Sequence, residues 1–121
     1  MIKYTENHEW VRVDGNKATM GVSDYAQDSM GDVVFVELPE VDDSFTQGDG
    51  MATIESVKAV SDVYAGVSGD IVEINEALLD EPELINSDPM GDGWLVVIDM
   101  KDPSDLDSLM TEEEYEAFIK E

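Results

Sequence analysis

The feature that most restricts the fold of this chain is a series of short strand-like segments between residues 41 and 99. They are rich in β-branched and apolar residues, which favour strands, and glycines separate them. The candidate strands lie at Phe45 and at residues 51–57, 59–64, 66–69, 71–74 and 94–98. Such close spacing is typical of a small β-sandwich or barrel and excludes a helical bundle.

The N-terminal part predicts a hairpin, a helix and a further strand. Residues 9–13 and 17–22 flank an Asp14-Gly15-Asn16 turn, and an Asp-Gly pair between alternating segments indicates a hairpin. Residues 23–31 then predict a short helix that has Ser23 as its N-cap and stops at Gly31. Residues 32–38, which are followed by Pro39, predict a largely buried strand.

Helical patterns return at the C-terminus. Residues 103–110 predict a short helix, and Thr111-Glu112-Glu113-Glu114 has the capping-box spacing that starts a second helix, from about Glu112 to Lys120. Tyr115, Phe118 and Ile119 share one face of that helix, which we expect to pack against the sheet. We expect one domain over residues 1–121, mainly β, with its core in about 17–100 and C-terminal helices in about 103–120.

The chain is strongly acidic, with 30 Asp and Glu against 6 Lys and Arg and a formal charge of −24. This charge repels nucleic acid phosphates and anionic lipids, so neither is expected as a partner. The acids form short clusters among apolar residues, which indicates a solvated surface and not a disordered tail. Repulsion among so many carboxylates is tolerable where salt screens it, since the Debye length falls to about 3 Å at 1 M salt. The composition therefore predicts a salt-loving source organism.

Several activities are excluded by missing residue types. Without cysteine there is no disulfide, thiolate nucleophile or zinc–thiolate site, so redox chemistry would require a cofactor. One histidine, no G-x-S-x-G motif and no EF-hand spacing give no catalytic or metal site. The sequence shows neither a secretory signal pattern nor the roughly 20 apolar residues that span a bilayer. We therefore expect a soluble protein of the prokaryotic cytoplasm.

Lys58 is the candidate functional residue. It is the one basic residue between Ala18 and Met100, and it stands at the turn of a strand–turn–strand pattern over residues 51–64. A lysine at a hairpin tip is accessible on a fixed platform, as the attachment site of a swinging prosthetic group requires. An isolated turn lysine is more often a solvated charge, so the surrounding residues decide between the two interpretations.

Those surroundings resemble a known family. The segment Glu55-Ser56-Val57-Lys58-Ala59 resembles the lipoyl-lysine motif of the glycine cleavage system H-protein family. Further collinear blocks that resemble the family are residues 4–5 with 8–10, 21–27, 31–39, and 82–86 with 91–94. The departures are Gly66 in place of a usual proline, Met90 in place of a common aromatic, and Asp42-Asp43 where a glycine often precedes the aspartate.

The resemblance implies a lipoyl/biotinyl-type barrel-sandwich hybrid with lipoate in amide linkage to Lys58. Loss of one positive charge would take the chain from −24 to −25. The implied protein is a non-catalytic carrier that moves an aminomethyl group from the glycine decarboxylase (P protein) to the aminomethyltransferase (T protein). It would pass its dithiol to dihydrolipoamide dehydrogenase (L protein), and a lipoylating enzyme would be a fourth partner.

The resemblance also implies roles for residues near the lysine. It places Glu9, His8 and Asp62 in a cleft that shields the loaded arm and offers carboxylates to its ammonium, and Glu55 and Ser56 in recognition by the lipoylating enzyme. Plainer interpretations remain open. Glu9 could be a solvated strand-end carboxylate, His8 a packed, hydrogen-bonded histidine, and Glu55 a strand residue that faces water.

Two other carrier functions would use the same lysine. A lipoyl donor that relays lipoate to 2-oxoacid dehydrogenase complexes needs the same Lys58, so the sequence alone does not separate it from the glycine cleavage carrier. A biotin carrier is disfavoured, because methionines usually flank its lysine and Val57 and Ala59 do so here.

Overall fold

The structure is a computed structural model that describes residues 1–120. Its strands are β1 (Ile2–Tyr4), β2 (Glu9–Asp14), β3 (Lys17–Val22), β4 (Val33–Glu37), β5 (Ser44–Phe45), β6 (Gly50–Ser56), β7 (Val60–Tyr64), β8 (Gly69–Ile74) and β9 (Val96–Met100). Its helices are α1 (Asp24–Met30), α2 (Ala77–Asp80), α3 (Leu84–Ser87), the 3₁₀ helix η1 (Pro103–Ser108) and α4 (Glu112–Ile119). The chain is mainly β with short helices, as predicted.

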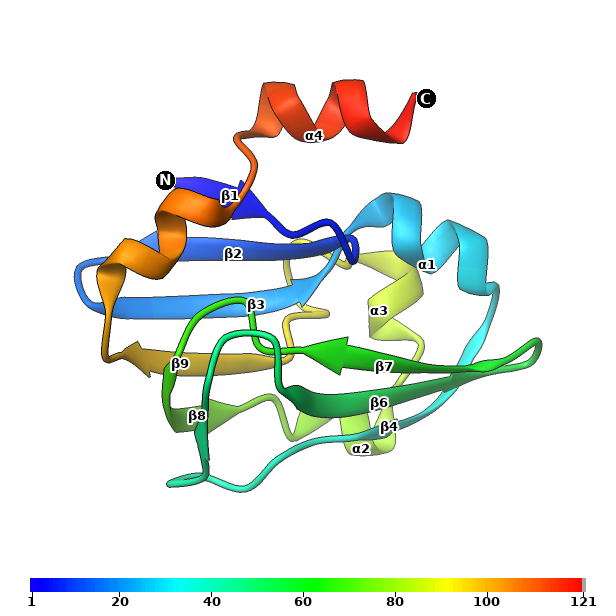
Figure 1. Ribbon diagram of the computed structural model, residues 1–121. Coiled ribbons are helices and arrows are strands. Elements are labelled where there is room, and N and C mark those ends of the chain that lie inside the picture. The colour runs from blue at the N-terminus through cyan, green and yellow to red at the C-terminus, as the bar shows by residue number, and fades with distance from the viewer. Residues whose placement is uncertain (121) are drawn as a thin grey trace.

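The strands form two antiparallel sheets (Figure 1). The larger sheet has the order β1-β2-β3-β9-β8-β5, and the smaller has the order β4-β6-β7. Both sheets contribute fully buried side chains to one apolar core, among them Val11, Met20, Ile54, Ile71 and Ile98. Burying each such side chain stabilises the fold by about 1.5 to 3 kcal/mol. The β6–β7 hairpin extends beyond this core at the right of Figure 1.

The predicted N-terminal hairpin and helix are confirmed. Strands β2 and β3 pair from Glu9 opposite Val22 to Asp14 opposite Lys17, and Gly15 takes the left-handed conformation in the turn. Helix α1 begins after Ser23, whose side chain accepts the Ala26 amide, and ends at Gly31 with φ 78°.

Other predictions need correction. Strand β4 is not largely buried: Val34 and Phe35 are 49% and 53% exposed, because one face of the three-stranded sheet meets water and a bulge lies between Val33 and Phe35. Residues 66–68 form a connection and not a strand. The reason is that Gly66 crosses between the sheets, against Val11 and Met20, before β8 begins at Gly69.

The C-terminal helices are close to the prediction. The first is a 3₁₀ helix, η1, and α4 follows the capping box between Thr111 and Glu114. Tyr115 is buried and stacks on Tyr4 of β1, with ring centroids 4.3 Å apart. Phe118, expected on the packed face, remains 37% exposed. Within residues 1–120, no helix is both long and apolar enough to cross a membrane.

Candidate functional site

Lys58 lies at the tip of the β6–β7 hairpin, in a three-residue connection that Ser56 organises. The Ser56 amide donates to the Ala59 carbonyl at 2.8 Å. The Ser56 hydroxyl accepts the amides of Lys58 and Ala59 at 3.3 and 3.2 Å and also lies 3.2 Å from the Ala59 carbonyl. The tip is therefore closed by its own hydrogen bonds, while the Lys58 side chain is exposed.

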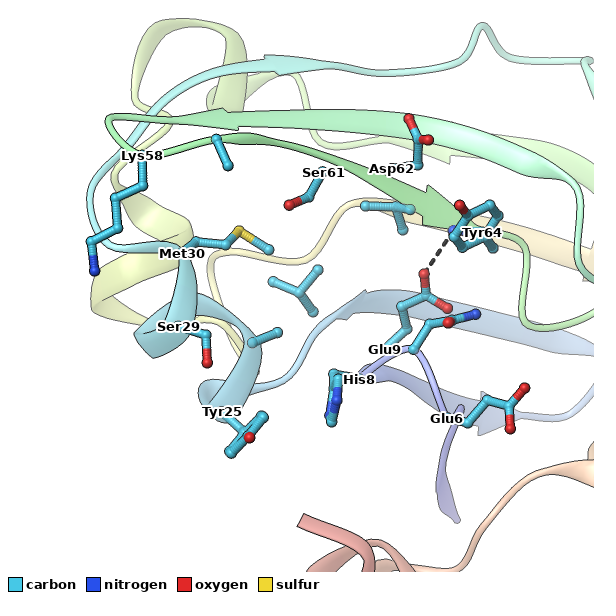
Figure 2. Close-up of a pocket in the computed structure, with 15 residues that line it drawn as sticks. Glu6, His8, Glu9, Tyr25, Ser29, Met30, Lys58, Ser61, Asp62 and Tyr64 are labelled. Atoms are coloured by element: carbon cyan, nitrogen blue, oxygen red, sulfur yellow. Dashed lines mark hydrogen bonds between the residues drawn. The ribbon is translucent and has the colours of Figure 1, made fainter.

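A cleft of about 570 Å³ begins beside this tip and runs between α1, β7 and residues 6–9 (Figure 2). Apolar side chains line much of it, namely Val22, Ala26, Met30, Ala59 and Val63. Tyr25, Ser29 and Ser61 add polar groups. Figure 2 shows Lys58 at one end of the cleft, with its amine directed away from Glu9 at the other.

Glu9 is buried at the inner end of the cleft. It is 2% exposed, and its two carboxyl oxygens accept the Thr5 hydroxyl at 2.9 Å and the Tyr64 amide at 2.6 Å. Burial raises the pKa of Glu9 to about 7, against the opposing effect of these hydrogen bonds. Because Glu9 is buried and hydrogen-bonded through both oxygens, the interpretation of this residue as a solvated strand-end carboxylate is wrong.

His8 forms part of the cleft wall and is also packed. Its φ of 67° is unusual for a residue with a side chain and accompanies the tight turn that begins at Thr5. Its Nδ1 lies 2.9 Å from the Tyr115 hydroxyl, which lies 2.7 Å from the Ser23 hydroxyl. Burial lowers the pKa of His8 and so favours the neutral imidazole. The tyrosine links α4 to the cleft through this contact.

Asp62 and Glu55 face away from the interior of the cleft. Asp62 pairs with Thr53, and Glu55 lies between Phe35 and Val60 on neighbouring strands. Strand alternation puts both carboxylates on the outer face of the small sheet. Asp62 borders the cleft, but Figure 2 shows its carboxylate turned away from Glu9. Glu55 is exposed to water.

The sequence did not single out the groups that hold Glu9. Thr5 acts through its hydroxyl, and Tyr64 through a main-chain amide that carries no residue-specific signal. Over residues 1–120 there is no cluster of His, Cys, Asp or Glu suited to a metal ion, and the one ion pair is Lys101 with Asp70. The site offers an exposed amine, an apolar passage and a buried acid. An apolar arm attached to Lys58 would find apolar side chains along the cleft and a carboxyl group at its inner end.

Comparison with known proteins identifies a family that the chain resembles over nearly its whole length. The family model described as glycine cleavage H-protein matches residues 2–121. H proteins of the glycine cleavage system from Halothermothrix orenii and Alcanivorax borkumensis are 55% and 53% identical to this chain, over 99% and 98% of it and 94% and 92% of their own lengths.

Comparison of the fold with solved structures indicates the same family. A crystal structure of a glycine cleavage system H protein from Mycobacterium marinum aligns with a TM-score of 0.91 at 36% identity, over 99% of this chain and 97% of that one. The predicted lipoyl-type barrel-sandwich fold is thereby confirmed. On its sequence and its fold alike, this chain belongs to the glycine cleavage H-protein family.

Proposed function

We propose that this chain carries lipoate in amide linkage to Lys58 and moves it among the enzymes of glycine cleavage. Family membership identifies it as a carrier component of that system. The observation that supports the attachment site is the position of Lys58, exposed on a closed hairpin tip at the mouth of a cleft that ends at a buried carboxyl group. A ligase can reach such a lysine without unfolding the domain.

The lipoyl group, when bound, supplies the dithiol chemistry that a chain without cysteine lacks. Val22, Met30 and Val63 line an apolar passage that excludes water from the methylenes of an arm. At its end, ionised Glu9 accepts hydrogen bonds from an ammonium group, and charge-assisted bonds are the stronger kind. Thr5 and Tyr64 hold the carboxylate in one orientation for that contact.

The partners follow from this carrier role. The chain receives an aminomethyl group from the P protein, delivers it to the T protein and presents the dithiol to the L protein, without catalysing a step itself. Exposed Glu55 is suited to direct recognition by a lipoylating enzyme, whereas Ser56 contributes by holding the tip. His8 shapes the cleft wall, and Asp62 contributes a carboxylate at the rim.

The attachment is tested by intact mass and peptide mapping after incubation with lipoate ligase, lipoate and ATP. We expect one lipoyl group on wild type and on Lys101→Arg, which alters another exposed lysine, and none on Lys58→Arg. Modification at another lysine, or none on wild type, would refute the proposal.

The carrier role is tested by reconstitution with the P, T and L proteins and measurement of carbon dioxide released from glycine. The lipoylated wild type should support release, and Lys58→Arg should not. Transfer of lipoate to 2-oxoacid dehydrogenase subunits by an amidotransferase, with no glycine-dependent activity, would instead indicate the relay function.

A further inference from the structure

The lysine tip rests on the short connection between α1 and β4, which we call linker 31–33. The Val57 amide donates to the Asp32 carbonyl at 3.0 Å. The side chain of Lys58 lies over Gly31, where an added Cβ would be 3.3 Å from its Cε and 3.6 Å from its Cδ. The position of the tip relative to α1 and the cleft therefore depends on where this linker is held.

One side chain, that of Asn86 in α3, holds the linker on both sides of Asp32. Its Oδ1 accepts the Val33 amide at 2.8 Å, and its Nδ2 donates to the Gly31 carbonyl at 2.9 Å. Nδ2 also lies 3.1 Å from Oε1 of Gln27 in α1. The Val33 N–H can only donate and the Gly31 carbonyl can only accept. The side chain between them must therefore carry an acceptor and a donor side by side, which neither an aspartate nor a leucine side chain does.

Helix α3, which carries Asn86, is packed against the apolar core. The neighbouring Ile85 is fully buried in the apolar core. A Cβ on Gly93 would approach the Leu84 carbonyl to 2.7 Å, which shows how closely the chain packs against the helix. Asn86 is thus fixed to the core on one side and hydrogen-bonded to the linker on the other.

We propose that Asn86 is a positioning residue for the attachment lysine, acting through linker 31–33. Its importance for modification rests on the proposed lipoate attachment at Lys58, but its effect on the tip does not. Without the amide, Val33 N–H and Gly31 C=O lose their partner, and the Asp32–Val57 hydrogen bond at the end of the β4–β6 ladder opens more often.

The test compares Asn86→Asp with a matched control, Asn75→Asp. Asn75 is also a bridging amide: its Nδ2 donates to the carbonyls of Asp92 and Trp94 at 2.8 and 2.7 Å, with no contact to the lysine tip. Amide hydrogen exchange is measured by NMR on the unmodified proteins, together with thermal unfolding. We expect Asn86→Asp to speed exchange at Val57 about tenfold beyond any global change. Asn75→Asp should change amide exchange at Val57 only as much as its effect on overall stability requires.

The same proteins are then assayed with lipoate ligase. Asn86→Asp should lower kcat/KM for lipoylation several-fold, and Asn75→Asp should not, even where it lowers the unfolding temperature as much. If either Asp variant fails to fold, the uncharged pair Asn86→Ser and Asn75→Ser replaces it.

Equal effects of the paired variants on Val57 exchange would show that Asn86 acts only in folding and would overturn the inference. A wild type that is not lipoylated would instead refute the attachment proposal. The exchange data would still decide the role of Asn86, because they do not depend on lipoylation.

Discussion

Replacing Glu9 by glutamine should raise the stability of the unmodified protein relative to wild type, progressively as the pH rises from about 4.5 to above 7. Burial raises the pKa of Glu9 from its ordinary 4.5 to about 7. Between these values the unfolded chain has released this proton and the folded protein retains it, so stability falls as pH rises. At about 1.4 kcal/mol per pKa unit, the loss is complete above pH 7 and amounts to about 3 kcal/mol. Glutamine does not ionise, and its oxygen still accepts the Tyr64 amide. Its NH₂ group faces the Thr5 hydroxyl, which donates to Glu9 in the wild type and already accepts the amides of Asn7 and Glu9, so this one contact is weakened at every pH.

Urea unfolding at constant ionic strength, at steps from pH 4.5 to pH 8, measures this difference. Relative to wild type, Glu9→Gln should gain about 3 kcal/mol between pH 4.5 and pH 8, in addition to a pH-independent cost from the weakened Thr5 contact. Glu6→Gln controls for net charge, because it removes an exposed carboxylate from the same turn. A constant difference between Glu9→Gln and wild type over this range would show that folding does not raise the pKa of Glu9 and would refute the reasoning.

Three further outcomes are expected. Ser56→Ala removes the acceptor for the Lys58 and Ala59 amides, so urea unfolding should show a loss of about 1 to 2 kcal/mol, with slower lipoylation by the ligase. Thr111→Ala removes the capping box and should weaken α4 by about 1 kcal/mol, seen as faster exchange of the Tyr115 amide. Molar potassium chloride should raise the urea midpoint of wild type, because it screens repulsion within a chain of charge −24; an unchanged midpoint would contradict this.

Local signals were sufficient for much of the fold. The Asp14-Gly15 turn and the Ser23 cap act on neighbouring residues, so the β2–β3 hairpin and α1 could be predicted without tertiary information. The exposure of Phe35 could not, since it depends on β4 joining a sheet of three strands with one face in water. A continuous apolar run is typical of a strand that is covered on both faces, so exposed Val34 and Phe35 depart from the alternation expected of a strand with one face in water.

The site depends on tertiary structure to a greater degree. Lys58 stands out by its isolation in the sequence, whereas the burial of Glu9 requires β2 of one sheet to lie beside β7 of the other. The orientation of Asp62 depends on pairing register, because a shift of one residue would turn its carboxylate into the cleft. Asn86 acts on a segment more than fifty residues away in sequence, and no local pattern marks that contact.

On the proposed function, the cleft must bind an ammonium group in a protein whose surface is already strongly acidic, and the burial of Glu9 sets this carboxyl group apart from the surface ones. Carboxylates on the surface attract any cation. In molar salt the Debye length is about 3 Å, so this attraction is largely screened. Among residues 1–120 Glu9 is the one buried carboxylate, so solvent ions have little access to it. Its contact with a bound ammonium should keep its strength in salt that suppresses surface attraction. On the proposed function, selectivity for an amine-bearing arm should come from this one desolvated carboxyl group and not from the many exposed ones, and Glu9→Gln should remove it with the surface charge otherwise intact.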